Sequence, residues 1–392
     1  MNEVVYTGEP FPASRADEAR LRQHLGGWVR REGPLLRIDK VVGQVRMDRD
    51  RTLVIRSRKA DGASLLAWLA HADPQLAALR MLGTTPRSAE DGGFGSLIAR
   101  VFCLETWRAI QTTGLLRSYH RRQIRAATIR GRIDFSQLSR GGGNLGRIPC
   151  VVFARLPQTP LNRLLAAATQ RIEHDTELRR AAGASLAMLS TALAEVPPLV
   201  TTAELARPPS LSRLEQPFAA SAALAGLLLC GNGLDDGRQV GGPALVVVIS
   251  RLFECTVVRA FRDARLRLST QHPVEVRYAG PHSTTGRSPM RIDLLLHDLP
   301  GGPVIVDAKY KTKITSSDLQ QMVTYCWATG ARRAVLVVPA GSVQDTRTIV
   351  LENAFDEQIE VAVAELQLGA RHLGGWQRAG QQLVEQVVQR SR

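Results

Sequence analysis

The sequence predicts a multidomain α/β protein with a β-rich N-terminal region, a mostly helical middle region and a C-terminal α/β domain. The chain has 392 residues, enough for two or three domains, and 44% of them are hydrophobic, as is ordinary for a soluble globular protein. Apolar residues alternate near the N-terminus, take helical spacing in the middle, and switch between strand and helix patterns from about Gly241. We therefore divide the chain into residues 1–95, 96–240 and 241–392.

The N-terminal region begins with strand signals. From about Leu35 to Arg58, apolar and charged residues alternate around a polar break at Asp48 to Asp50, which predicts a β-hairpin or small sheet. The segment SLLAWLAHADPQLAALRML, which starts at Ser64, predicts a helix. A second helix is expected from Phe94 until Gly114, a residue typical of helix ends.

A basic stretch opens the middle region. Residues 117–132 contain six arginines and no acid. They form either a solvated helix or loop face, or a stretch that contacts phosphates or a protein partner. In the second interpretation the contacts are made by Arg117, Arg121, Arg122, Arg125 and Arg130. The sequence does not separate DNA from a protein as their target.

The rest of the middle region reads as helical. A glycine-rich loop at residues 139–146 is followed by an alanine- and leucine-rich segment, residues 161–196. Its apolar spacing predicts one or two long helices that end at Pro197 and Pro198.

The overall charge points to a polyanionic partner. The formal net charge is +15 and the isoelectric point is about 10.5, which favours nucleic acid first and an anionic membrane surface second. The N-terminus lacks a signal-peptide pattern, and the longest apolar run, Ala219 to Cys230, is too short to span a bilayer. We therefore expect a cytoplasmic protein that has no membrane partner.

The five cysteines show no pattern of a zinc site or of a disulfide framework. They are widely spaced, odd in number and free of any CxxC arrangement. This pattern argues against a zinc site and against a disulfide framework.

The C-terminal region predicts a compact α/β domain of about 150 residues. An apolar segment from Pro243 to Leu266 precedes three strand signals, VEVRYA, MRIDLLLH and PVIVDAKYK. A helix, SSDLQQMVTYCWATG, and a further strand, RAVLVVPA, follow them.

Two of these strands bring charged residues together. MRIDLLLH and PVIVDAKYK are separated by DLPGG, a strong turn sequence. A hairpin centred on Pro300 makes Asp293 and Asp307 cross-strand neighbours, with Cβ atoms about 5 Å apart. Since side chains alternate along a strand, Lys309 lies on the same face as Asp307.

These residue types suit phosphodiester hydrolysis. Two facing carboxylates repel each other unless a cation lies between them, and oxygen ligands without His or Cys favour Mg²⁺ or Mn²⁺. Lys309 can then orient or deprotonate the attacking water, or stabilise charge that develops on the phosphate.

The pattern D-(x)13-D-x-K resembles that of the PD-(D/E)xK nuclease superfamily, which carries its site on such a hairpin within a mixed central sheet flanked by helices. The resemblance implies that Asp293, Asp307 and an upstream helical acid, Glu254, bind the metal, and that these three residues and Lys309 are catalytic. Ile292 replaces the usual proline before the first aspartate.

Two further positions follow the same resemblance. Gln321 and Tyr325, one helical turn apart, match the QxxxY element of RecB-like members, which lines the active site or contacts DNA. Lys311 lies on the same face of the strand as Lys309, two residues further along. We expect it to contact a phosphate or to form a solvated strand end.

A closer resemblance is to the McrC family, the nuclease subunit of McrBC-type modification-dependent restriction systems. It rests on Leu252 to Glu254, on IVDAKYK and on the pattern DxxQMxxY from Asp318 to Tyr325. Residues 129–135 and 159–165 are similar to landmarks of the family.

Membership of this family implies a division of labour between two proteins. The partner would be a hexameric AAA+ GTPase of the McrB type, which binds GTP and recognises double-stranded DNA with modified cytosine. This chain would cut the DNA and stimulate the GTPase, and its residues 1–95 would dock on the ring. The nearest match to a nucleotide-binding loop here, GPHSTTGRS, has one residue too many and Arg287 in place of lysine, so we expect a turn instead.

Two alternatives remain open from the sequence. The first alternative to the McrC interpretation is a RecB-like DNA repair nuclease that acts without GTP. The second is a non-catalytic adaptor of a GTPase ring. The presence of both aspartates, the lysine, the glutamine and the tyrosine argues against the adaptor.

Overall fold

The computed structural model describes most of the chain. The described residues are 2–48, 51–58, 62–72, 93–140, 147–199, 211–230, 244–279, 285–311, 313–342, 348–352 and 358–389. The predicted glycine-rich loop at 139–146, the second half of the helix predicted from Ser64, and the first part of GPHSTTGRS lie largely outside them.

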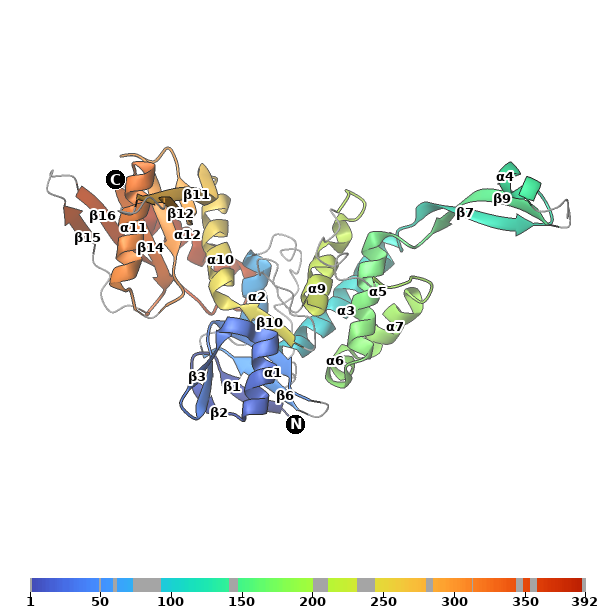
Figure 1. The fold of residues 1–392 in the computed structure, drawn as a ribbon, viewed down its shortest axis with the longest axis horizontal. Coiled ribbons are helices and arrows are strands. Elements are labelled where there is room, and N and C mark those ends of the chain that lie inside the picture. The colour runs from blue at the N-terminus through green and yellow to red at the C-terminus, as the bar shows by residue number, and fades with distance from the viewer. Residues whose placement is uncertain are drawn as a thin grey trace. The chain divides into compact units, whose positions relative to one another are not determined.

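The chain forms two compact units, the second of which is inserted into the first. The first unit contains residues 1–97 together with 230–392, and the second contains residues 98–229 (Figure 1). The first and last of the three regions defined from the sequence therefore share one unit, while the division into three domains stays a prediction.

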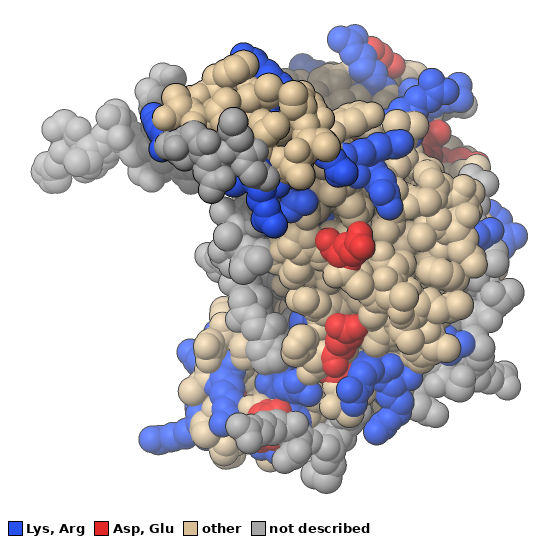
Figure 2. Space-filling model, turned by 90° about the vertical axis from the view of Figure 1, so that its right-hand side faces the viewer, with Lys and Arg blue, Asp and Glu red and all other residues tan. Residues whose placement is uncertain are grey.

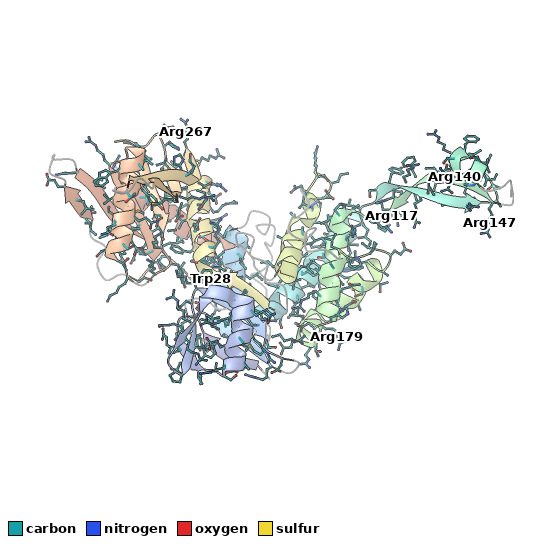
Figure 3. The ribbon with its side chains drawn as sticks, viewed as in Figure 1. Trp28, Arg117, Arg140, Arg147, Arg179 and Arg267 are labelled. Carbon is teal, nitrogen blue, oxygen red and sulfur yellow. The ribbon has the colours of Figure 1, made fainter. Side chains whose placement is uncertain are left out.

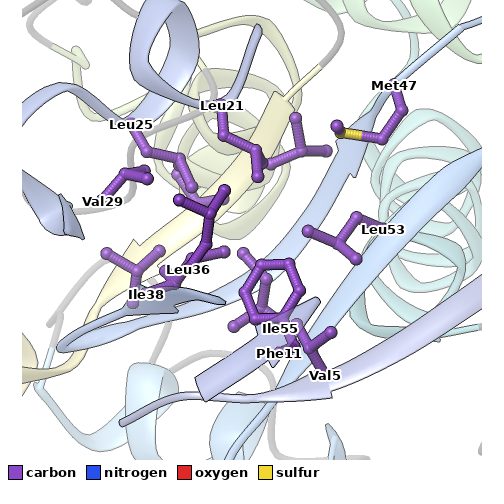
Figure 4. Packing of buried hydrophobic residues seen from close by; sticks show 13 residues of the cluster. Val5, Phe11, Leu21, Leu25, Val29, Leu36, Ile38, Met47, Leu53 and Ile55 are labelled. Atoms are coloured by element: carbon purple, nitrogen blue, oxygen red, sulfur yellow. The ribbon is translucent and has the colours of Figure 1, made fainter. Parts of the chain in front are cut away.

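Two small sheets and a helix build the N-terminal part of the first unit. The predicted hairpin around Asp48 is confirmed, because β5 and β6 pair antiparallel. Thirteen buried residues from both sheets, from α1 and from neighbouring turns form one apolar core (Figure 4). The first sheet has the order β1 (Asn2–Tyr6), β6 (Thr52–Arg56), β5 (Val41–Arg46), β10 (Ala244–Val248), the second has the order β2 (Pro10–Pro12), β4 (Leu35–Ile38), β3 (Val29–Glu32), and α1 spans Arg15–Leu25.

The C-terminal part of this unit is attached to the N-terminal part at two places. Strand β10 completes the N-terminal sheet by pairing with β5, and α10 (Ile249–Asp263) follows it directly. Helix α2 (Gly62–Ala72) packs against α10 and α12 (Leu373–Gln389). There the indole Nε1 of Trp68 donates a 2.6 Å hydrogen bond to Thr256 Oγ1, and its ring stacks on Trp376.

A six-stranded mixed sheet forms the centre of the C-terminal part. Strands β13, β14 and β16 run parallel, while β11, β12 and β15 join antiparallel. Helix α11 (Ser316–Thr329) lies across this sheet (Figure 1). The predicted strands and helix are confirmed, whereas β15, β16 and α12 were not predicted. The sheet order is β11 (Leu268–Ala279), β12 (Thr285–Leu296), β13 (Val304–Ala308), β14 (Arg333–Pro339), β16 (Gln358–Leu366), β15 (Ile349–Glu352).

The second unit is built from helices and one three-stranded sheet. Helix α3 (Gly93–Thr113) ends as predicted at Gly114, whose N–H bonds Ile110 O at 2.7 Å. The prediction of one or two long helices over 161–196 is wrong, because the N-cap Asp175 and then Gly183 divide the segment into three. These are α5 (Pro160–Glu173), α6 (Thr176–Ala182) and α7 (Ala184–Ala192), and α9 (Ala219–Cys230) follows.

The arginine-rich stretch is a strand, so the expectation of a helix or loop face is wrong. β7 (Ser118–Ala126) pairs antiparallel with β9 (Ile148–Leu156) along its whole length, and β8 (Arg132–Ile133) pairs with β9 as well. This ribbon extends away from the helices of its own unit and carries α4 (Phe135–Arg140) at its end (Figure 1). We call the described residues of 117–157 the arm.

Of the two landmarks that resemble the McrC family, residues 129–135 lie in the arm and residues 159–165 lie directly after it, at the start of α5. In residues 129–135, Gly131 has a φ of 72°, and a Cβ there would come within 2.5 Å of Val151 O. In residues 159–165, buried Asn162 donates from Nδ2 to Leu116 O at 2.8 Å and to Pro157 O at 2.7 Å. Asn162 therefore fixes both chain segments at the base of the arm.

The surface agrees with the basic composition. On the face shown in Figure 2, lysine and arginine side chains gather in several groups and acidic side chains are few. Among the helices that the structure describes, none is long and apolar enough to cross a membrane.

Candidate active site

The hairpin of β12 and β13 has the predicted centre. Leu294 pairs with Val306, Leu295 with Ile305 and Leu296 with Val304, so the register is symmetric about Pro300. The next position outward in this register places Asp293 opposite Asp307. The tight turn depends on Gly301 and Gly302, which have φ values of 84° and 101°.

Both aspartates lie on the face that α11 covers. Leu295 and Ile305 belong to one buried cluster with Met322 and Tyr325 of α11. Asp293 and Asp307 are each two residues further along their strands, so alternation keeps them on this face. They therefore continue an apolar surface, where charge is poorly solvated.

Asp293 has a strongly perturbed acidity. Its Oδ2 accepts a 2.9 Å hydrogen bond from the backbone N–H of Ala308. Burial, followed by repulsion from Asp307 and Glu254, raises the pKa of Asp293 to about 7. Asp293 thus resists ionisation until a positive charge compensates it.

Asp307 is paired with the predicted lysine. Its side chain is 2% exposed, and Lys309 Nζ lies 2.7 Å from its Oδ2. This oxygen receives no well-aligned hydrogen bond from the described residues. Burial raises the pKa of Asp307 in spite of the ammonium beside it.

Lys309 is held at the end of β13 by its backbone. Its N–H bonds Val337 O at 2.8 Å, which continues the pairing with β14. Burial opposes the charge of the ammonium, but attraction to Asp307 outweighs it and the pKa of Lys309 is raised. The side chain therefore carries a proton at neutral pH.

Glu254 reaches the same site from α10. The helix buries Leu252 and Phe253, and Glu254 is half-buried beside them. Its Oε1 accepts hydrogen bonds from Arg251 at 2.6 Å and from Gln271 at 2.5 Å. Glu254 lines one cleft with Asp293, and its charge contributes to the raised pKa of that carboxyl.

A cleft of about 380 Å³ opens beside these residues. Glu254 and Asp293 line it together with Gln271, and α10 adds the basic residues Arg259 and Arg262. Among the described residues, no three acidic, histidine or cysteine side chains meet as a ready-made metal-binding group. The three predicted metal ligands are thus near one another but do not converge on one point.

Gln321 and Tyr325 come together as the pattern predicted, yet they face the sheet. Gln321 Nε2 donates to the hydroxyl of Tyr325 at 2.7 Å, and that hydroxyl donates to Arg291 O at 2.7 Å. Arg291 is two residues before Asp293 on β12, and Tyr325 is buried. Tyr325 therefore fixes the strand that carries Asp293.

Lys311 is engaged within the protein. Its Nζ lies 2.7 Å from Asp318 Oδ1. Asp318 in turn forms a capping box with Thr315 at the start of α11. The ion pair thus links the segment after β13 to the helix that carries Gln321 and Tyr325.

An aromatic cluster that the sequence did not predict lies behind the site. Tyr310, between the two lysines, contacts Phe253 and Trp68 with ring centroids 5.7 Å and 6.3 Å away. Phe253 precedes Glu254, and Trp68 comes from the N-terminal α2. No local sequence pattern predicts this cluster, because its residues are far apart in the sequence.

A second residue that the sequence did not predict is Gln271 on β11. The register of β11 and β12 places it opposite Asp293, but the two residues do not pair. Its backbone φ is +50°, a left-handed conformation that costs a residue other than glycine on the order of 1 kcal/mol or more.

The arginines of the basic stretch lie in the other compact unit. Arg121, Arg122 and Arg125 are exposed on β7, and Arg117 and Arg130 flank the strand. Arg117 lies where the arm begins, while Arg140 and Arg147 lie towards its far end (Figure 3).

The arm also exposes large apolar side chains. Tyr119 is 73% exposed, Phe135 70%, Phe153 68% and Ile129 60%. The register places Tyr119 opposite Arg155 and Phe153 opposite Arg121, so these four residues share one face of the ribbon. A ribbon with exposed aromatic and basic residues is typical of an interaction surface.

Comparison with known proteins defines the class of protein. The family model of the McrBC 5-methylcytosine restriction system component matches residues 36–339. The chain therefore belongs to this family and is a component of a McrBC-type restriction system. The resemblance to McrC seen in the sequence is thereby confirmed. No curated protein matches the chain.

One solved structure shows the same fold. It is a half-complex from a tetradecameric assembly of Thermococcus gammatolerans McrB AAA+ hexamers with bound McrC. The matched chain superposes with a TM-score of 0.67 at 15% identity, over 99% of this chain and 100% of that one. A second, the cryo-EM structure of the Thermococcus gammatolerans McrBC complex, gives a TM-score of 0.47 at 17% identity, over 69% and 90% of the two chains.

Proposed function

We propose that this chain is the DNA-cutting subunit of its restriction complex, a Mg²⁺-dependent endonuclease with a PD-(D/E)xK-type site. The observation that carries the proposal is the pair of facing carboxylates, Asp293 and Asp307, with the ammonium of Lys309 2.7 Å from the second. This is the arrangement that the family pattern requires for phosphodiester hydrolysis.

The residues present fit a hard divalent cation. Asp307 Oδ2 is buried without a well-aligned hydrogen bond, and the pKa of Asp293 is raised to about 7 by burial and by its acidic neighbours. The single ammonium of Lys309, 2.7 Å from Asp307 Oδ2, does not offset the repulsion among the carboxylates, so a further positive charge would be stabilised here. Asp293 and Asp307 would hold Mg²⁺ or Mn²⁺, with Glu254 close by, since Mg²⁺ typically uses one or two carboxylates and several waters. When bound, the cation lowers the pKa of a water and polarises the phosphate.

Lys309 would act through its charge. Its raised pKa keeps it protonated at neutral pH, which favours stabilisation of the developing phosphate charge over removal of a proton from water. The hydrogen bond of its backbone to β14 holds it at the site. Tyr325 and Gln321 support this arrangement by fixing β12, and Lys311 does so by anchoring α11.

The cleft beside the carboxylates suits a DNA strand. Arg259 and Arg262 of α10 line the same cleft as Glu254. Arg262 is exposed, so its guanidinium can bind a backbone phosphate. Such contacts position DNA without reading its sequence, which leaves recognition of modified cytosine to the partner.

The partner would be a hexameric AAA+ GTPase of the McrB type, which binds GTP and whose hydrolysis this chain stimulates. The structure with a TM-score of 0.67 comes from McrB AAA+ hexamers with bound McrC. The exposed apolar residues of the arm favour a protein contact there over a contact with DNA alone. Docking by residues 1–95 stays a prediction.

The experiment is cleavage of DNA containing 5-methylcytosine by the purified complex with GTP and Mg²⁺. Asp307→Ala and Lys309→Ala should each lower the cleavage rate at least about 100-fold, because they remove a metal ligand and the charge beside it. Lys313→Ala, which removes an exposed lysine four residues further on, should cut at the wild-type rate. Complex formation and GTP hydrolysis should be unchanged in all three.

Other outcomes identify the competing functions. If the Asp307→Ala complex cut at the wild-type rate, the assigned site would be wrong, and the adaptor would be favoured. Cleavage of DNA ends without GTP or partner would indicate a RecB-like repair nuclease.

A further inference from the structure

We infer that Gln271 is a positioning residue, which holds Glu254 towards Asp293 and thereby sets the affinity of the site for its metal. This inference rests on the function proposed above and adds a residue that the sequence motifs did not single out.

The backbone of Gln271 is unusual in its place. Among the described residues, four other than glycine have a positive φ, namely Lys40, Arg265, Gln271 and Asp298. Lys40, Arg265 and Asp298 lie in turns between elements, where such a conformation reverses the chain. Gln271 alone among them lies inside a strand, and glutamine has no special tolerance for this conformation.

The distortion falls at the catalytic position. Thr270 pairs with Leu294 and His272 with Ile292, so the register continues on both sides of Gln271. The missing pair is the one opposite Asp293. Strained backbone persists only where the surroundings impose it, and it gathers at functional sites.

The side chain shows what the distortion achieves. Gln271 Nε2 donates a 2.5 Å hydrogen bond to Glu254 Oε1, and both residues line the cleft with Asp293. Glu254 and Asp293 repel each other, as the raised pKa of Asp293 records. Arg251 also donates to Glu254 Oε1, but it belongs to the same helix, whereas Gln271 ties the carboxylate to β11 at the position opposite Asp293.

The choice of an amide is consistent with a cation site. Arg251 already brings one positive charge to Glu254 Oε1 at 2.6 Å. A second cation in place of Gln271 would compete with a metal, whereas a neutral donor orients the carboxylate without adding charge. Partners of this kind typically change metal affinity by 10- to 100-fold when they are removed.

The test is titration of the full chain with Mn²⁺ in a calorimeter, without DNA or partner. Gln271→Gly removes the amide and relaxes the backbone, so it should bind Mn²⁺ about 10-fold more weakly and should unfold at the same temperature or higher. Arg265→Gly is the matched control, because it relaxes a left-handed residue of φ 58° that does not line the cleft. It should bind Mn²⁺ as the wild type does.

Each result has a separate meaning. Equal Mn²⁺ affinity for Gln271→Gly and the wild type would overturn the inference while leaving the proposed nuclease site in place. Absence of binding by the wild type itself would overturn both. If the glycine variant does not fold, Gln271→Asn replaces it. Asparagine accepts a left-handed backbone, but its shorter side chain cannot reach Glu254 equally well. Wild-type Mn²⁺ affinity of the asparagine variant would also overturn the inference.

Discussion

The β12–β13 hairpin and the β7–β9 ribbon are both antiparallel pairs rich in charged residues, but they place those residues in opposite surroundings. In the hairpin, Asp307 is buried and Lys309 neutralises it at 2.7 Å. On the ribbon, Arg121 and Phe153 face each other and both are exposed. The hairpin is covered by α11, whereas within its own unit the arm pairs mainly with itself and α4.

This difference indicates how each region works. Burial makes the charges of the hairpin strong and costly, so they perform chemistry only where the protein fixes every group. Each exposed charge of the arm contributes little interaction energy, because water screens it. Together with the aromatic residues, these charges contribute substantially only when a bound partner excludes water. Four predictions test this contrast.

The largest difference should appear in stability. Trp68→Ala removes a buried ring that packs on Tyr310, next to Lys309, and joins α2 to α10 and α12. It should lower the free energy of unfolding by about 3–5 kcal/mol. Tyr119→Ala on the arm should change it by less than about 0.5 kcal/mol. Urea unfolding of both variants measures this, and equal losses would contradict the contrast.

Two aspartates should show pH dependences of opposite sign. The pKa of Asp293 is raised from 3.8 to about 7 in the folded protein, so the proton on Asp293 stabilises the fold. This contribution is complete below pH 3.8 and is lost as the pH rises towards about 7, at about 1.4 kcal/mol per pH unit at most. In metal-free protein, the free energy of unfolding of Asp293→Asn should therefore rise relative to that of the wild type as the pH increases from 4 to 7.

Asp134 on the arm provides the counterpart. A hydrogen bond from Ser136 is the main cause that lowers its pKa, so its contribution is present above 3.8 and is lost as pH falls. Asp134→Asn should then lose stability relative to the wild type at neutral pH. Unfolding curves at pH 4, 5.5 and 7 compare the two variants, and a shared direction would refute the assignment.

The third prediction concerns partner binding. Replacing Tyr119 and Phe153 together by alanine should weaken binding to the GTPase ring at least about 30-fold, because both lie on the exposed face of the arm. Arg122→Ala, on the opposite face, should have a small effect. Sedimentation of the mixed proteins measures the affinities.

The same experiment separates protein contact from DNA contact. If the arm bound DNA instead, neutralising Arg121, Arg122 and Arg125 would lower the affinity for plain DNA without the GTPase and would reduce its salt dependence.

The smallest effect should come from the site's support. Tyr325→Phe removes the hydrogen bonds to Arg291 O and from Gln321, and it should cost about 1 kcal/mol of stability and slow cleavage a few-fold. Unfolding and cleavage assays on one preparation measure both. A loss as large as that of Lys309→Ala would assign Tyr325 to the chemistry instead.

The sequence predicted the hairpin because its determinants are local. The turn DLPGG and the alternation of apolar residues place Asp293 and Asp307 opposite each other without reference to the rest of the chain. Gln321 and Tyr325 followed from helical spacing alone. Their contact with Arg291 O did not, since it depends on how α11 crosses the sheet.

Other features depend on contacts that no local pattern records. Trp68 reaches Tyr310 across most of the chain, and the backbone of Gln271 is set by its neighbours in space. No strand was predicted within residues 117–132, because the arginines obscure the alternation of apolar and polar residues and the pairing strand β9 begins only at Ile148.

The pairing of β10 with β5 has a consequence for synthesis of the protein. Strand β5 ends at Arg46, and its neighbour β10 starts at Ala244, so the ribosome must add nearly 200 residues before that edge can be covered. At 5–20 residues per second this takes about 10–40 s. The inserted unit can fold in this interval, while the nascent N-terminal sheet presents an open edge that a chaperone would be well placed to protect.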